Sequence, residues 1–330
     1  MRVLVTGGGG FLGGGVVRAL LARGDSVVSI ARGDYPHLRE LGVETVRGDL
    51  AEPSVALAAA EGCDVVVHVA ARAGIWGTPA QFERSNVEAT RCVLAACRTL
   101  GIRRLVHTST PSVVHAGGDI VGGDETLPYA THFTSDYPRT KAVAERLVLA
   151  AADDELATVA LRPHLVWGPG DTQLVPRILE RARGGRLRFV DGGQAVFDTT
   201  YVDDAVAAHL CAVDRLAPGA DCSGRAYFIS SGDPRPMREI VNAILAAAGM
   251  PPEHRSVPLA VAVAAGTVAE ALWRLLGRQD EPPMTRFLAH QLATSHWFDI
   301  SAARRDLGYA PQVGLDEGFR RLATSLREAA

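Results

Sequence analysis

The chain has 330 residues, of which 47% are hydrophobic and 22% are charged, a composition typical of a globular protein with one large core or two smaller ones. Its formal net charge of −3 and isoelectric point near 6.4 provide no general positive field, so we expect it not to bind nucleic acid. Five cysteines at no metal-ligand spacing, and a start without the apolar core of a signal peptide, predict a cytoplasmic protein without a disulfide framework or a metal site.

Short β-branched runs alternate with helical segments through the first half of the chain. The runs predicted to be strands are residues 3–5, 27–30, 64–68, 105–107 and 158–161. Segments such as 15–24 and 86–101 lie between them, with apolar residues at helical spacing and a glycine at the end. This alternation predicts an α/β fold, a Rossmann-type doubly wound parallel sheet with helices on both faces.

The pattern changes after about residue 165, where proline and glycine become frequent and alanine-rich helical stretches dominate. We therefore expect a dinucleotide-binding domain in residues 1–165 and a smaller, mainly helical substrate-binding region in residues 166–197 and 231–330. Residues 198–230 are expected to return to the first domain, because 196–213 has the pattern of a strand followed by a helix.

One later segment, residues 257–269, carries no charge. A helix that spans a membrane needs roughly 20 apolar residues, so this segment is too short. We interpret it as a helix that packs in the core, in preference to a contact with a membrane or a partner. With the apolar residues 271–277 it is also a candidate cover for alkyl chains of a substrate.

Seven glycines fall within Gly7–Gly15, directly after the first predicted strand and at the start of the first predicted helix. In that context the backbone amides and the helix dipole favour a bound pyrophosphate. Glycines 7, 10 and 13 or glycines 8, 10 and 13 fit the spacing, and Thr6 favours the first register. The residues expected to contact the dinucleotide here are Gly7, Gly10, Phe11, Leu12 and Gly13.

The end of the second predicted strand bears on which nicotinamide cofactor is used. Ala31 and Arg32 stand where an acidic residue would hold the adenine ribose hydroxyls of NAD. Because an arginine accepts a 2′-phosphate, NADPH/NADP+ is favoured over NAD, although Asp34 is close by. Further cofactor contacts are expected at the ends of the third and fourth strands, from Asp49, Leu50, Ala70 and Ala71.

The chemistry is predicted at Tyr137 and Lys141, which lie four residues apart at a helix start containing Pro138. A tyrosine has an ordinary pKa near 10, and lowering it by three units takes about 4 kcal/mol from an adjacent ammonium. A hydroxyl at the end of the preceding strand would hold the substrate oxygen beside Tyr137. The candidates for that hydroxyl are Thr110, Ser109 and Ser112.

These motifs resemble the extended short-chain dehydrogenase/reductase family over essentially the whole chain. The segments that carry the resemblance are VTGGGGFLG, GDL, HVAA, NVEAT, VHTST, YPRTK, LRPHLVWGPGD, TTYVDDAVAAHL and DISAARRDLGYAP. The resemblance implies that Thr110, Tyr137 and Lys141 are catalytic, with Tyr137 and Lys141 also contacting the cofactor. It further implies a structural role for Asn86 and places Pro163 and His164 beside the nicotinamide.

Within this family, AARAGIWG, EPPMTRF and HWFDISAARRDLGY resemble the 3β-hydroxysteroid dehydrogenase branch. The resemblance implies NADPH-dependent reduction of the ketone of a hydrophobic β-keto acid with two long alkyl chains, in olefin biosynthesis. Arg72 is a candidate for the substrate carboxylate, with a surface role preferred. A homodimer, association with other enzymes of a lipid pathway and peripheral membrane contact are also implied.

Three other functions stay open on the sequence. A 3β-hydroxysteroid or sterol dehydrogenase shares the motifs, and a non-catalytic NAD(P)-binding sensor would share the fold but usually loses the tyrosine or the lysine. A nucleotide-sugar epimerase or dehydratase would need basic residues for a diphosphate. The candidates for that role are Arg177, Arg181, Arg183 and Arg186.

Overall fold

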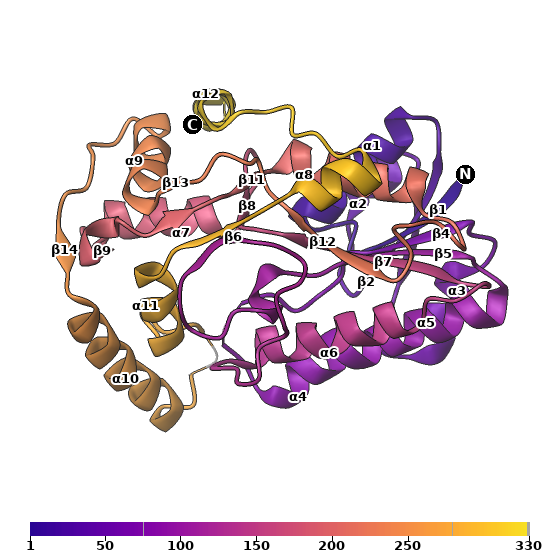
Figure 1. The fold of residues 1–330 in the computed structure, drawn as a ribbon, viewed down its shortest axis with the longest axis horizontal. Coiled ribbons are helices and arrows are strands. Elements are labelled where there is room, and N and C mark those ends of the chain that lie inside the picture. Colours follow the sequence, from indigo (N-terminus) through magenta and orange to yellow (C-terminus); the bar gives the residue numbers. More distant parts are fainter. Residues whose placement is uncertain (75, 279, 329–330) are drawn as a thin grey trace.

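The computed structural model describes residues 1–74, 76–278 and 280–328, and a seven-stranded parallel sheet runs through its centre (Figure 1). In spatial order the strands are β12 (Arg225–Ile229), β7 (Ala157–Pro163), β5 (Arg104–Thr108), β4 (Val65–His68), β1 (Arg2–Thr6), β2 (Ser26–Ala31) and β3 (Glu44–Arg47). Each pairs in parallel with its neighbours, and the order reverses between β1 and β4 as in a Rossmann sheet. The predicted fold class is confirmed.

The central strands are buried on both faces, because successive side chains of a strand point to opposite sides. Val3 and Val5 pack in one core, whereas Leu4 between them packs in the other. The helices that cover the first face are α1 (Phe11–Ala22) and α8 (Val202–Arg215). Those on the second face are α3 (Pro53–Ala60), α5 (Ala89–Leu100) and α6 (Asp136–Ala150).

The later part of the chain adds short strands and helices beside this sheet (Figure 1). A four-stranded sheet joins β13 (Arg235–Pro236), β10 (Val196–Phe197), β15 (His296–Phe298) and β6 (Ile120–Gly123). The other short strands are β8 (Val166–Trp167), β9 (Phe189–Val190), β11 (Thr200–Tyr201) and β14 (Ser256–Val257). The remaining helices are α2 (Pro36–Glu40), α4 (Pro79–Phe82), α7 (Leu174–Arg183), α9 (Met237–Ala247), α10 (Leu259–Leu275), α11 (Arg286–Ala293) and α12 (Leu315–Glu328).

Residues 225–229 form the edge strand β12 beside β7, and α8 packs against β5 and β7. Both lie in the segment 198–230 that is expected to return to the first domain. The exact division of the chain into two domains stays a prediction.

Helix α10 corrects the interpretation of residues 257–269 as a core segment. Its buried residues are small or paired, namely Ala262, Gly266, Ala269 and Glu270. Most of its other side chains are exposed, because α10 contacts the body mainly through α11 on one side. None of the helices within the described ranges has the length and hydrophobicity needed to cross a membrane.

Candidate active site

The glycine-rich turn connects β1 to α1 and is shaped by three glycines that touch one another. Gly7 has a φ of +73°, and its carbonyl oxygen accepts a hydrogen bond from the Gly10 amide at 3.0 Å. A Cβ at Gly13 would overlap that same carbonyl oxygen, so α1 can approach the turn this closely only with glycine there. Gly7 thus lies against both Gly10 and Gly13, but Gly8 also lies close to Gly13, so the choice between the two registers stays a prediction.

The start of α1 suits the dinucleotide that the resemblance implies. Gly10 precedes the helix without a side-chain cap, and the first turn carries no acidic residue. The amides of Phe11 and Leu12 begin the helix, where backbone N–H groups lack an intrahelical acceptor. This cradle, which a side chain at Gly13 would close, fits a pyrophosphate.

Three arginines gather where β2 and β3 end. Arg32 is exposed, and within the described part of the chain its guanidinium makes no hydrogen bond or ion pair. Asp34, by contrast, is bound by Arg39 at 2.5 Å. Arg47 donates to the Arg32 carbonyl at 3.3 Å. The acidic group near this strand end is thus already paired, whereas the Arg32 side chain is free to bind an anion.

The other residues expected to contact the adenosine half differ in accessibility. Asp49 accepts from the Ala51 amide at 3.1 Å and from Arg84 at 2.9 Å, so a ligand amine would share its carboxylate with Arg84. Leu50 is buried beside it. Of the small residues after β4, Ala70 donates its amide to Thr6 at 3.0 Å, and Ala71 is exposed.

Tyr137 and Lys141 lie in the first two turns of α6, which begins at Asp136 as predicted. Lys141 is buried, and its ammonium donates to the Thr108 carbonyl at 2.6 Å and to Nε2 of His107 at 3.2 Å. Burial lowers the pKa of Lys141 to about 8.

The expected lowering of the tyrosine pKa is not found. Burial raises the pKa of Tyr137 above its ordinary value, and a hydrogen bond with Thr110 only opposes that shift. The Lys141 ammonium is bound to the end of β5, so desolvation dominates at the phenol. Tyr137 is therefore protonated at neutral pH.

Of the three candidate hydroxyls, Thr110 is the one that the structure brings to Tyr137. Its Oγ1 lies 3.0 Å from Oγ of Ser112 and accepts from the Ser112 amide at 3.3 Å. Thr110 also caps the short 3₁₀ turn Pro111–Val113. The Ser109 hydroxyl is buried and has no hydrogen-bond partner among the described residues. Ser112 thus supports Thr110, and these two side chains contact each other after the end of β5.

A buried chain of hydrogen bonds joins the end of β1 to the start of α6. Thr6 contacts His68 at 2.8 Å, and His68 contacts Thr90 at 3.0 Å. Thr90 donates to the Asn86 carbonyl at 2.6 Å, and the Asn86 amide donates to Thr140 at 3.0 Å. Thr140 then donates to carbonyl oxygens in the first turn of α6. Asn86 itself lies in a π-helical turn before α5, a feature frequent at functional sites.

Three buried histidines lie around this chain of hydrogen bonds, and the sequence analysis did not identify them as part of the site. Burial lowers the pKa of His68 to about 3 and that of His209 to about 4, and it holds the pKa of His107 well below its ordinary value. They are neutral at pH 7, so the positive charge of this cluster resides on Lys141. His68 and His107 each follow a β-branched run at the end of a predicted strand. That position is the sequence feature that could have identified them.

Pro163 ends β7, and His164 follows it as a buried side chain. Nδ1 of His164 lies 2.7 Å from the Asp198 carboxylate, which also accepts from the Phe298 amide at 3.0 Å. The geometry thus fixes the imidazole, and its contact with a nicotinamide stays a prediction.

Arg72 is partly buried, and its guanidinium lies 5.3 Å from the ring centre of Phe82. A role in binding a carboxylate stays a prediction. Ile75, in the motif at residues 70–77, lies outside the described residues.

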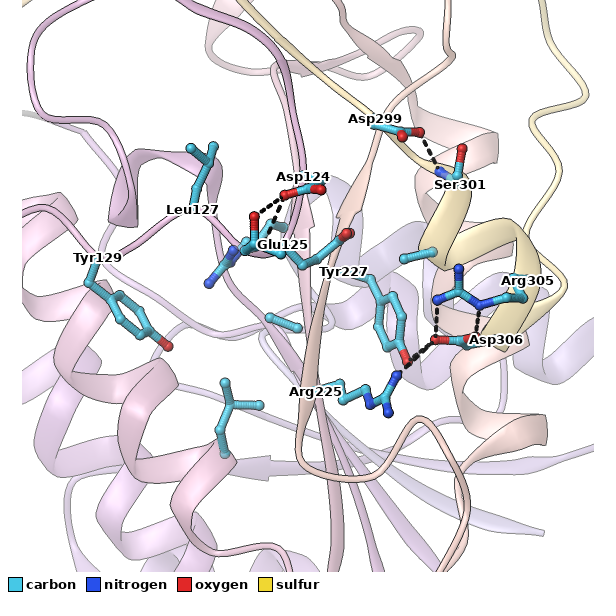
Figure 2. Close-up of a pocket in the computed structure, with 15 residues that line it drawn as sticks. Asp124, Glu125, Leu127, Tyr129, Arg225, Tyr227, Asp299, Ser301, Arg305 and Asp306 are labelled. Atoms are coloured by element: carbon cyan, nitrogen blue, oxygen red, sulfur yellow. Dashed lines mark hydrogen bonds and ion pairs between the residues drawn. The ribbon is translucent and has the colours of Figure 1, made fainter.

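A cavity of about 520 Å³ lies away from these residues (Figure 2). None of the predicted site residues lines it. Figure 2 shows Tyr227 and Arg305 directed at Asp306, to which they donate at 2.9 and 2.7 Å. Arg225 lies 3.5 Å from the same carboxylate. Because the predicted site residues lie outside this cavity, we place the candidate site at Tyr137.

The chain is similar to known proteins over nearly its whole length. The family described as "3-beta hydroxysteroid dehydrogenase/isomerase family" matches residues 4–260. A 2-alkyl-3-oxoalkanoate reductase of Stenotrophomonas maltophilia is 53% identical over 328 residues, covering 98% of this chain and 99% of the relative. One of Shewanella oneidensis is 47% identical over 333 residues, covering 98% and 86%. Among solved structures, MoeE5 in complex with UDP-glucuronic acid and NAD is similar over 100% of both chains, with a TM-score of 0.77 and 26% identity.

We expect Gly13→Ala to weaken NADP+ binding by about tenfold or more, because relieving the overlap with the Gly7 carbonyl costs roughly 1–3 kcal/mol of distortion in the turn. Titration calorimetry measures the affinity, and urea unfolding shows whether the variant is folded. Gly314→Ala is the matched control, because a Cβ there meets nothing within 4 Å. Unchanged affinity in folded Gly13→Ala would contradict the assignment of the cradle.

Proposed function

This chain belongs to the 3-beta hydroxysteroid dehydrogenase/isomerase family, and we propose that it reduces the ketone of a 2-alkyl-3-oxoalkanoate with NADPH, in the biosynthesis of long-chain olefins. It is an oxidoreductase that acts on CH–OH groups and uses a nicotinamide dinucleotide. The observation that carries the proposal is that Tyr137 and buried Lys141 lie four residues apart at the start of α6, in a chain similar to two such reductases over 98% of its length.

The residues that hold the cofactor follow from the site. The amides of Phe11 and Leu12 would take the pyrophosphate, and Arg32 with Arg47 would take a 2′-phosphate. Lys141 has three N–H donors, of which two are used within the protein, and the third would hold the ribose. The bound cofactor supplies the hydride that reduces the ketone carbon.

Tyr137 acts as the general acid in this reaction. The ketone oxygen accepts hydrogen bonds from Tyr137 and Thr110, and it takes the phenolic proton as negative charge develops on it. Because burial raises the pKa of Tyr137, the phenol holds its proton at neutral pH until the substrate oxygen becomes basic. The Lys141 ammonium, fixed at the end of β5, stabilises the phenolate that is left behind.

The nucleotide-sugar alternative is disfavoured by the arginines that it would require. Arg177 is paired with Glu281 at 2.7 Å, and Arg181 donates to the Pro283 carbonyl at 2.9 Å. Arg186 lies 3.7 Å from Glu180. Because these arginines are already bound within the protein, less positive charge is available to bind a diphosphate. Steroid substrates share the proposed chemistry, so a direct comparison of substrates must separate them.

We expect Tyr137→Phe to lower the oxidation of a 2-alkyl-3-hydroxy fatty acid by NADP+ by about 10²- to 10⁴-fold, because the proton-transfer group is lost. This direction avoids the β-keto acid, which decarboxylates readily. NADPH absorbance measures the rate, with a 3β-hydroxysteroid as the comparison substrate. Tyr227→Phe, away from the site, is the control and should keep full activity. An unchanged rate in Tyr137→Phe would refute the mechanism.

We expect kcat/KM for ketone reduction to fall as pH rises through about 8, because Lys141 carries its charge below its lowered pKa and loses it above. In Lys141→Arg the charge persists, so the fall should move to higher pH in whatever activity remains. Steady-state rates from pH 6 to pH 10 test this, with far-UV circular dichroism as the control for folding. A wild-type profile that is level from pH 7 to about 9.5 would contradict the role of the ammonium.

We expect Arg32→Ala to lower the ratio of kcat/KM for NADPH to that for NADH by about 10- to 100-fold, the equivalent of one charged hydrogen bond. The NADH value should change little, because only NADPH carries the 2′-phosphate. Arg91→Ala, an exposed arginine paired with Glu88, is the matched control. An unaltered ratio in Arg32→Ala would remove the structural basis for NADPH preference.

A further inference from the structure

His164 and Asp198 form a buried pair that the proposed reduction does not use. Nδ1 of His164 lies 2.7 Å from Oδ1 of Asp198, and the other carboxylate oxygen accepts from the Phe298 amide at 3.0 Å. Asp198 is only 1% exposed, so these two contacts stabilise its charge in place of water. Because an ionised carboxylate only accepts hydrogen bonds, the ring proton lies on Nδ1, and Nε2 of the neutral ring carries a lone pair.

The imidazole of His164 is held in place by its surroundings. The ring centres of Phe197 and Phe298 lie 6.1 and 5.3 Å from its own. Its backbone is held as well, because the amide donates to the Ile229 carbonyl at 3.0 Å and the carbonyl accepts from the Thr200 hydroxyl at 2.7 Å. The side chain is nevertheless 11% exposed, and Nε2 makes no hydrogen bond with any residue in the described part of the chain. A fixed ring with one free nitrogen is arranged to accept a proton from a ligand.

His164 lies at the same edge of the sheet as the residues that would bind the ketone. Strand β7 is the neighbour of β5, with Leu161 opposite Thr108, and His164 directly follows β7. Thr110 follows the end of β5 by two residues. In an open parallel sheet, ligands bind beyond the carboxyl ends of the strands. The ends of two adjacent strands therefore bring His164 and Thr110 to the region where the substrate is expected.

The inference rests on the proposed function, because it concerns a second reactive bond of the same substrate. In a 2-alkyl-3-oxoalkanoate, carbon 2 carries one hydrogen between a ketone and a carboxylate, and the two carbonyl groups make that C–H bond acidic. Tyr137 holds its proton and donates it, and the Lys141 ammonium is a donor as well, so neither accepts the proton of carbon 2. Chemistry at carbon 2 therefore needs a base that these two residues do not supply.

We propose that Nε2 of His164 removes the proton from carbon 2 of the bound keto acid, so that the protein enolises its substrate as well as reducing it. The C–H bond breaks, Nε2 gains the proton, and the electron pair forms the double bond between carbons 2 and 3 of an enolate. The enolate oxygen accepts hydrogen bonds from Tyr137 and Thr110. Return of a proton to carbon 2 restores the ketone, so no oxidant or reductant is consumed. A proton from water on the opposite face gives the other epimer, and both epimers then reach one reduction site.

The test is hydrogen exchange at carbon 2, measured in D₂O on the full chain with NADP+, so that no hydride is transferred. A short-chain 2-alkyl-3-oxoalkanoate is kept near pD 8 as the carboxylate, which loses CO₂ more slowly than the acid. Samples are reduced with borohydride, and mass spectrometry measures the deuterium at carbon 2. We expect wild-type protein to raise the exchange rate by about 10²-fold or more, the usual contribution of a general base. His164→Asn should lower the ratio of exchange to NADPH-dependent reduction by a similar factor, because its amide can donate to Asp198 but cannot take a proton.

The matched control is His254→Asn, which changes an exposed histidine and should exchange like wild type. Tyr137→Phe should shift the ratio of exchange to reduction the other way, because it removes the proton donor of the reduction and keeps the base. An unaltered ratio in His164→Asn would overturn the proposal and leave His164 a structural or carboxylate-binding role. Wild-type protein that reduces the keto acid without speeding the exchange would refute this proposal alone. Wild-type protein that does neither would refute the proposed function as well.

Discussion

The buried hydrogen-bond chain from β1 to α6 is the constraint on which the site depends. The order of the protons is determined, because the Thr90 hydroxyl donates to a carbonyl and His68 is neutral. Thr6 donates to His68, His68 to Thr90, and Thr90 to the Asn86 carbonyl. The Asn86 amide then donates to Thr140, which donates into the first turn of α6. Moving α6 would strand buried polar groups at roughly 1–3 kcal/mol each, so these hydrogen bonds fix α6 relative to the end of β1.

The pKa values of the groups around Lys141 depend on burial more than on pairing between opposite charges. Desolvation drives the histidines near Lys141 neutral, and burial lowers the pKa of Lys141 itself to about 8, although nearby Glu145 opposes that shift. The same desolvation holds the proton on Tyr137. A protonated phenol and a poised ammonium are the state that reduction of a ketone needs at its start, since the proton must be given and not taken.

The sheet and much of the site could be predicted from sequence, because both depend on local pattern. Alternating strands and helices predicted the parallel sheet, and the contact among glycines 7, 10 and 13 follows the motif spacing. The spacing of Tyr137 and Lys141 predicted their helix start, but not that the ammonium would bind Thr108. That contact, like the pairing of His68 with Thr90, joins residues of different elements, which periodicity within one segment does not encode.

Helix α10 shows why hydropathy alone gave a wrong prediction of burial for residues 257–269. An uncharged segment predicts burial because apolar side chains avoid water, but it does not show which side of the helix finds a partner. Here Gly266 and Ala269 contact the protein, and close approach to α11 needs side chains that small. The large residues are left outside, so the segment contributes little to the core and much to the surface. The uneven division of residue size between the two sides of α10, and not its mean hydropathy, therefore determines which of its residues are buried.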